Sequence, residues 1–253
     1  MGRKISKDDL LVHKEEAILK FSSYLDSLIE SDDFKLMGKA DKLSYWLKDW
    51  SSFLGFESDF SANSLRRYKR GEIIKAHLGF NVGSEEGGLH YCVVLDRNNS
   101  KNSPIVTVVP LTSVKSKTDL NHLHLGNIYI GNELFTNLTS KISYTEKFLS
   151  SRVIDLKERI SALSNDAFEE ESQQITSSLE ECHRDLDLIK RMKFEVNKMK
   201  IGSIALVCQI RTISKMRIYD PKTNFDILSG VKLSSEKLDL IDHEILQSFT
   251  GYR

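Results

Sequence analysis

The sequence contains few cysteines and no stretch that could cross a membrane. Its three cysteines, Cys92, Cys182 and Cys208, are widely spaced and form no CxxC pair, which argues against a disulfide framework and against a zinc knuckle. No apolar run approaches the ~18 residues of a bilayer span, and the charged N-terminal segment lacks the apolar region of a signal peptide. We therefore expect a protein of a reducing compartment, cytoplasmic and without a membrane partner.

The sequence also lacks a net charge. Lysine plus arginine number 36, and aspartate plus glutamate number 36. The chain thus has no global positive field of the kind that draws proteins to duplex nucleic acid. Any contact with nucleic acid must be local.

Motifs for nucleotides and metals are absent as well. There is no Walker loop, GxGxxG or HExxH, and the glycine-rich GSEEGG segment (83–88) lacks the lysine and hydroxyl residue that hold nucleotide phosphates. His122 and His124 form an HxH pair on one side of an expected strand, but no third ligand lies at a suitable spacing. We expect no cofactor and no metal site, and a packing or surface role for this pair.

Two segments near the N-terminus have helical periodicity. Residues 7–56 contain no proline, and apolar residues recur at helical spacing in 8–30 and in 39–54. The second segment has one broad apolar face, made by Leu43, Trp46, Leu47, Trp50 and Leu54. Such a face is typical of a core or a dimer contact.

The apolar period changes to two between residues 69 and 131. Short segments rich in β-branched and aromatic residues are separated by Gly, Asn and Ser clusters; they are 72–80, 90–96, 105–112 and 122–130. The pattern returns at 202–213. We expect the strands on both sides of the intervening segment to belong to one sheet or barrel.

The intervening segment, 142–200, has a heptad pattern. Apolar residues step by four and three from Leu149 to Leu163 and, after a Ser-Asn-Asp turn, keep the same phase from Phe168 to Val196. Two heptad helices joined by a turn predict an antiparallel coiled-coil hairpin inserted into the β region.

A last amphipathic helix is predicted near the C-terminus. Ser234 is its expected N-cap, and its apolar stripe consists of Leu238, Ile241, Ile245 and Phe249.

Several polar residues stand at the ends of the expected strands. They are His90, Thr112, Ser113, Gln209, Arg211 and Thr212. An imidazole can transfer a proton near neutral pH, while a guanidinium and hydroxyls can hold a phosphate as its charge grows. Together such groups suffice for metal-free RNA cleavage by the neighbouring 2′-hydroxyl. Taken singly, the histidine is also explained as a structural residue before a strand, and the arginine as a surface charge.

The order of five segments adds a family resemblance. The segments are RGEI (70–73), GSEEGG (83–88), NSPIVTVVPLTS (102–113), QIRTI (209–213) and the terminal helix. In this order they resemble the MazF/PemK family, the endoribonuclease toxins of bacterial toxin–antitoxin pairs, over about 69–131 and 202–250. The resemblance implies an SH3-like small β-barrel of the MazF/PemK type with a C-terminal helix. The periodicity adds N-terminal helices and an inserted antiparallel helical hairpin, so the expected fold class is α+β. The expected parts are 1–63, 64–141, 142–200 and 201–253.

The same resemblance implies an activity and a site. It implies a homodimer that cuts single-stranded RNA at short sequences without a metal, with an antitoxin protein as partner. The loop with Ser84 and Glu85 would cover the RNA groove, and Thr112 matches the family's catalytic threonine. The expected catalytic residues are His90, Thr112 and Arg211, and the expected substrate-binding residues are Ser84, Glu85, Ser113, Gln209, Thr212 and Arg70.

Two positions depart from the family pattern. The family has Arg-Pro after the loop, where the arginine helps catalysis, whereas this chain has His90 and Tyr91; some relatives have an aspartate where this chain has Cys208. A histidine is only partly charged near pH 7. Either His90 takes over as general acid or base, which we favour, or catalysis is weak and the barrel mainly binds. His77 is the reserve candidate.

Two further interpretations stay open. The barrel could be an inactive regulator that binds RNA or protein, or the chain could be a structural adaptor acting through 142–200. The RRYKRGEIIK stretch (66–75) places five basic residues around Tyr68. Such a stretch can bind single-stranded RNA, with the cations on the phosphates and the tyrosine stacked on a base. It is equally typical of a linker with solvated charges.

Overall fold

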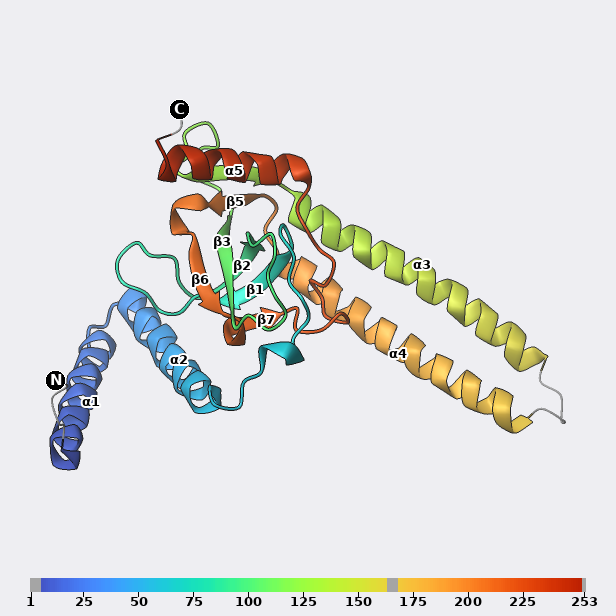
Figure 1. Ribbon diagram of the computed structural model, residues 1–253, viewed down its shortest axis with the longest axis horizontal. Coiled ribbons are helices and arrows are strands. Elements are labelled where there is room, and N and C mark those ends of the chain that lie inside the picture. Colours follow the sequence, from blue (N-terminus) through green and yellow to red (C-terminus); the bar gives the residue numbers. More distant parts are fainter. Residues whose placement is uncertain (1–5, 163–167, 252–253) are drawn as a thin grey trace. The chain divides into compact units, whose positions relative to one another are not determined.

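The chain divides into two compact units, Met1–Asp59 and Phe60–Arg253. The structure is a computed structural model, and it describes residues 6–162 and 168–251 (Figure 1). The first unit contains the helices α1 (Lys7–Ile29) and α2 (Phe34–Phe56). Asp33 caps α2 by accepting a hydrogen bond from the Lys35 N–H at 2.7 Å. The second helix therefore begins at Phe34, five residues before residue 39, the start that its apolar stripe predicted.

A seven-stranded antiparallel sheet forms the centre of the second unit. Its strands are β1 (Ile73–His77), β2 (Leu89–Val94), β3 (Ile105–Ser113), β4 (Asn127–Gly131), β5 (Ser203–Leu206), β6 (Arg211–Ser214) and β7 (Ile218–Asp220). The order is β4-β5-β3-β2-β1-β7, and β6 pairs with β3. Sheet and helices together make an α+β fold, which confirms the predicted class. Closure into an SH3-like barrel stays a prediction.

Strand β3 pairs with two strands along its length. Residues 105–108 pair with β6, and residues 111–113 pair with β5. A 3-10 turn, Val207–Gln209, separates β5 from β6. Gly126 makes room for this turn, because a Cβ at its position would lie 2.0 Å from Cys208 Sγ. The β pattern expected over 202–213 therefore forms two strands, β5 and β6, because the chain bends between them.

The expected strand over 122–130 is also too long. β4 begins only at Asn127, and His122 and His124 lie in the turn before it. There His122 Nδ1 lies 2.9 Å from an Asp119 carboxylate oxygen. Among the described residues no group of three His, Cys, Asp or Glu side chains is placed to hold a metal ion.

Two long helices run side by side away from the sheet (Figure 1). They are α3 (Glu133–Ser161) and α4 (Phe168–Lys198). Arg152 of α3 pairs with Glu181 and Asp185 of α4, and Glu146 of α3 pairs with Lys193 of α4 at 2.7 Å. These pairs set an antiparallel register. The predicted Ser-Asn-Asp turn lies outside the described residues.

Only part of the heptad seam is buried. Leu156, Ile175 and Cys182 form a small cluster with Leu149. The alternate seam positions, Val153, Ile160, Leu179 and Leu186, are between 38% and 50% exposed. A pair of helices buries one stripe of each, so the neighbouring seam positions face outward. A coiled coil in the strict sense stays a prediction.

Two hydrophobic cores lie on the two faces of the sheet. We call the helices α3 and α4 the arm, and the core on their side of the sheet the arm-side core. This core joins the sheet to the bases of α3, α4 and α5, and it includes Val93, Leu111, Leu138, Met192 and Ile241. The opposite core includes Tyr68, Cys92, Val94, Val106, Val108 and Ile218. Side chains along β2 and β3 alternate between these cores, as the period of two requires.

The C-terminal helix α5 (Ser235–Phe249) begins where it was predicted. Ser234 Oγ accepts a hydrogen bond from the Lys237 N–H at 3.3 Å. Ile241 is buried in the arm-side core, whereas Phe249 at the end of the stripe is exposed. Within the described part of the chain, no helix has both the length and the apolar character to span a membrane.

Candidate functional site

The His90 ring is held between two hydrogen-bond acceptors at the start of β2. Its Nδ1 lies 3.2 Å from the Leu111 carbonyl oxygen of β3, and its Nε2 lies 3.0 Å from a Glu86 carboxylate oxygen. A carbonyl and a carboxylate accept, so a doubly protonated ring can donate to both and a neutral ring to only one. The His90 side chain is 24% exposed. The ring is therefore oriented by protein groups and still open to solvent.

The loop that carries Glu86, residues 78–88, is fastened by side-chain amides; we call it the GSEEGG loop. Gln209 Oε1 accepts the Glu86 N–H at 3.1 Å, and Gln209 Nε2 donates to the Ser84 carbonyl at 3.2 Å. Asn81 Nδ2 donates to the Glu86 carbonyl at 2.6 Å. Gly87 lets the loop close, because a Cβ there would lie 2.7 Å from the Gly79 carbonyl oxygen. These contacts fix Glu86 beside His90.

Arg211 reaches the same region from β6. Its Cα pairs with Val108 of β3, so its side chain lies on the sheet face of the opposite core. One guanidinium nitrogen donates to Gln209 Oε1 at 3.2 Å. Burial raises the pKa of the nearby Cys92 thiol to about 12, with the Arg211 charge acting in the other direction. Cys92 is thus a neutral thiol at physiological pH and no candidate nucleophile.

Arg217 adds a second cation to this end of the sheet. It follows β6, and its Nε donates to the His77 carbonyl at 2.8 Å. Burial and the charge of Arg211 lower the pKa of Arg217. His77, the reserve candidate, accepts the Gly79 N–H at 3.0 Å through Nδ1. This bond gives His77 a structural part in the turn after β1.

Thr112 lies on the same face as His90 and Arg211. The alternation along β3 sends Val106, Val108 and Thr112 to one face, while Leu111 points into the arm-side core. The three expected catalytic residues thus share one face of the sheet. Thr112 is partly buried there.

Two expected substrate-binding residues lie on the other face. Ser113 follows Thr112, and its side chain therefore points the opposite way. Thr212 pairs with Thr107 across β6 and β3, and the two hydroxyl oxygens lie 3.1 Å apart. Neither side chain joins the group around His90.

Arg70 also lies apart from this group. It sits near the far end of β2, where it donates to the Leu95 carbonyl at 2.6 Å and pairs with Asp242 of α5. Arg70 therefore ties the sheet to the C-terminal helix.

The rest of the basic stretch has similar structural roles. Arg66 pairs with Glu72 at 2.7 Å. Tyr68 is fully buried, and its hydroxyl donates to the Pro221 carbonyl at 2.8 Å. A buried tyrosine cannot stack on a base, so the proposed RNA grip by this stretch is wrong for Tyr68.

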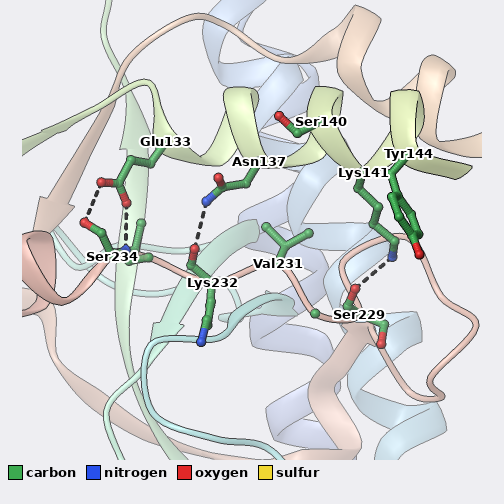
Figure 2. Close-up of a pocket in the computed structure, with 11 residues that line it drawn as sticks. Glu133, Asn137, Ser140, Lys141, Tyr144, Ser229, Val231, Lys232 and Ser234 are labelled. Atoms are coloured by element: carbon green, nitrogen blue, oxygen red, sulfur yellow. Dashed lines mark hydrogen bonds between the residues drawn. The ribbon is translucent and has the colours of Figure 1, made fainter.

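A groove of about 700 Å³ lies between α3 and residues 229–234 (Figure 2). The polar groups that line it form hydrogen bonds with each other. Asn137 donates to the Lys232 carbonyl at 2.8 Å, and Glu133 accepts from the N–H and the hydroxyl of Ser234 at 2.8 and 2.6 Å. The lining groups fasten α3 to the segment before α5, and the lining includes no expected site residue.

Lys141 fastens the same helix at the edge of the groove (Figure 2). Its Nζ donates to the carbonyls of Asp226, Ile227 and Ser229 at 3.1, 2.9 and 2.8 Å. Burial lowers the pKa of Lys141 to about 8. All three donor positions of the ammonium are used in this tie.

Sequence reasoning missed Glu86 and Arg217. Both lie in short irregular segments where no periodicity indicates the direction of a side chain. The one available signal for Glu86 was its place four residues before His90, next to the acid that was selected, Glu85.

Residues 69–182 match the family model of the PemK-like, MazF-like toxin of type II toxin–antitoxin systems. The match contains β1 to β4, α3 and the first half of α4, and thus the GSEEGG loop, His90 and Thr112. It ends before Gln209 and Arg211. A comparison with curated proteins gave no match.

Proposed function

The chain carries a PemK-like, MazF-like toxin domain, and we propose that it is the toxin of a toxin–antitoxin pair and an endoribonuclease for single-stranded RNA. The observation that supports this best is the common face of His90, Thr112 and Arg211 at the rim of the opposite core. A proton carrier, a hydroxyl and a guanidinium project from this face, beside a loop held in place by Gln209.

The proposed reaction is metal-independent transesterification. The 2′-oxygen attacks the adjacent phosphorus, the bond from phosphorus to the 5′-oxygen breaks, and the products are a 2′,3′-cyclic phosphate and a 5′-hydroxyl. His90 Nε2 gives its proton to the departing 5′-oxygen. Arg211 and Thr112 stabilise the charge that grows on the phosphorane oxygens.

The remaining parts of the proposal concern recognition. Ser84, Glu85 and Gln209 border the proposed face and are assigned to RNA binding. Ser113, Thr212 and Arg70 point away from it and are left out. Homodimerisation, an antitoxin protein as partner and a cytoplasmic location complete the proposal.

Cleavage of a long unstructured RNA by the full chain in EDTA tests this proposal. We expect cuts at a short sequence, leaving 5′-hydroxyl ends. The same RNA with a single 2′-deoxynucleotide on the 5′ side of one mapped bond should resist cutting there and be cut elsewhere. Cutting at the 2′-deoxy position would overturn the 2′-hydroxyl mechanism, and binding without any cutting would favour the regulator.

A further inference from the structure

We infer that Glu86 is the general base of the proposed cleavage reaction, with His90 as its general acid. This inference rests on the proposed function and assigns a second proton carrier to the same site. Such a reaction moves two protons, one off the 2′-hydroxyl and one onto the 5′-oxygen, so it needs an acceptor as well as a donor.

The contacts of His90 fit the donor role. Both ring nitrogens face acceptors, the Leu111 carbonyl and the Glu86 carboxylate, at 3.2 and 3.0 Å. The ring makes both hydrogen bonds when it carries both protons. In that state it can give a proton and cannot take one.

The acceptor must come from the other groups around the ring. Thr112 of β3 and Ala76 of β1, which pairs with His90, carry no charge. Arg211 of β6 and Arg217 after it are cations, and guanidinium groups do not exchange protons near neutral pH. Glu86 carries the carboxylate that contacts the His90 ring directly, at 3.0 Å, and this contact assigns the acceptor role to Glu86.

Cys92, on the strand of His90, is excluded for a different reason. Burial raises the pKa of its thiol to about 12, so the thiol stays protonated and buried. The Glu86 side chain, in contrast, is 27% exposed, about as open to solvent as the His90 side chain at 24%.

The short distance between the Glu86 and His90 side chains also allows both to return to their starting protonation states after the reaction. In the reaction the Glu86 carboxylate takes the 2′-hydroxyl proton as the 2′-oxygen to phosphorus bond forms, and His90 Nε2 loses its proton to the 5′-oxygen. Glu86 is then protonated and His90 neutral. At 3.0 Å the proton can pass from Glu86 back to Nε2, which restores both groups without solvent.

Two substrates separate this role from a merely positioning one. The first is RNA cut at the mapped bond, and the second is the same RNA with a bridging sulfur in place of the 5′-oxygen at that bond. A thiolate leaves without a proton, so the sulfur substrate needs the base but not the acid. We expect His90→Ala and Glu86→Gln each to slow cleavage of ordinary RNA about 10²–10⁴-fold. On the sulfur substrate His90→Ala should recover toward the wild-type rate, and Glu86→Gln should stay slow.

The exposed Asp119–His122 pair provides a matched control. Its ring nitrogen and carboxylate oxygen lie 2.9 Å apart, far along the chain from the GSEEGG loop, and Asp119→Asn should cut both substrates like the wild type. Glu86→Asp, which keeps the carboxylate, should retain part of the activity, and thermal unfolding checks that each variant is folded.

The outcomes separate the two proposals. Recovery of Glu86→Gln on the sulfur substrate, or wild-type cleavage of ordinary RNA by this variant, would overturn the role of Glu86 and leave the nuclease function standing. A folded wild-type protein that cuts neither substrate would overturn the proposed function and this inference with it.

Discussion

His90 and Tyr91 are neighbours in β2, yet their side chains have opposite surroundings. His90 faces the GSEEGG loop and solvent. Tyr91 faces the helical arm, where its hydroxyl donates to Glu195 of α4, and Glu195 also pairs with Lys75 of β1. Burial, and then the bond to Glu195, raises the pKa of Tyr91 well above its ordinary range. One step along a strand thus separates the proposed proton carrier, which is partly open to solvent, from a fixed anchor for the arm.

The largest expected effect is on the His90 side of this comparison. We expect His90→Ala to lower the rate of RNA cleavage about 10²–10⁴-fold, because it removes the proposed acid. Its unfolding temperature should stay near that of the wild type, because the ring lies at a partly exposed rim. Cleavage rates and thermal unfolding of the same sample check both parts, and unchanged cleavage would remove His90 from the mechanism.

The next effect is on the Tyr91 side and concerns stability. Glu195→Ala leaves Lys75 and Tyr91 without their shared partner in a mostly buried site, and we expect it to lower the free energy of unfolding by about 3 kcal/mol. Urea unfolding measures this loss. Glu146→Ala is the control, because its pair with Lys193 is exposed and should contribute only about 0.5 kcal/mol. Equal losses in the two variants would contradict the anchoring role of Glu195.

The two sides also differ in how far the sequence could predict them. The period of two predicted the strand segments 90–96 and 105–112, and a local cap predicted the start of α5 at Ser234. These features depend on neighbouring residues. The bend at 207–209 depends instead on the packing of Cys208 against Gly126, which is remote in the sequence and leaves no periodic signal.

The site shows the same limit more clearly. The family resemblance selected His90, Thr112 and Arg211, and strand alternation then explains their common face. Arg70 was expected to bind substrate, but it pairs with Asp242, which is 172 residues away in the sequence. Glu195, which anchors Tyr91, is 104 residues from it. Long-range pairs of this kind decide whether a charged residue is available to a ligand, and no local pattern shows them.

A smaller effect is expected when Tyr91 loses only its hydroxyl. Tyr91→Phe removes one hydrogen bond while Lys75 still pairs with Glu195, so we expect a loss of about 1 kcal/mol in the free energy of unfolding at neutral pH. Urea unfolding of this variant and of Glu195→Ala shows whether the hydroxyl or the ion pair contributes more. A loss as large as that of Glu195→Ala would assign the anchor to the hydroxyl alone.

The same variant should change the response to acid. Burial raises the pKa of the Glu195 carboxyl, but the hydrogen bonds from Lys75 and Tyr91 and the charge of Lys75 lower it on balance. A depressed carboxyl pKa stabilises the fold above the unfolded value of about 4.3, and this contribution disappears as the pH falls through the folded value. Tyr91→Phe should lose less stability than the wild type on acidification below about pH 4.5, and an equal loss would contradict the coupling.

The last expected effect concerns pH and the second anchor of the arm, Lys141 of α3. Burial lowers the pKa of its ammonium to about 8, so between about pH 8 and 10.4 the unfolded chain binds more protons at this residue than the folded chain. Its contribution to the free energy of unfolding therefore rises with pH across that window. Lys141→Met lowers stability at every pH because three carbonyls lose their donor, but it should also remove this rise. The measurement is the slope of stability against pH from 7.5 to 9.5, below the range in which tyrosines titrate. Parallel slopes for the two proteins would show that Lys141 stays protonated over this pH range. Its ammonium would then hold α3 as a permanent charge, as the Glu195 carboxylate holds α4.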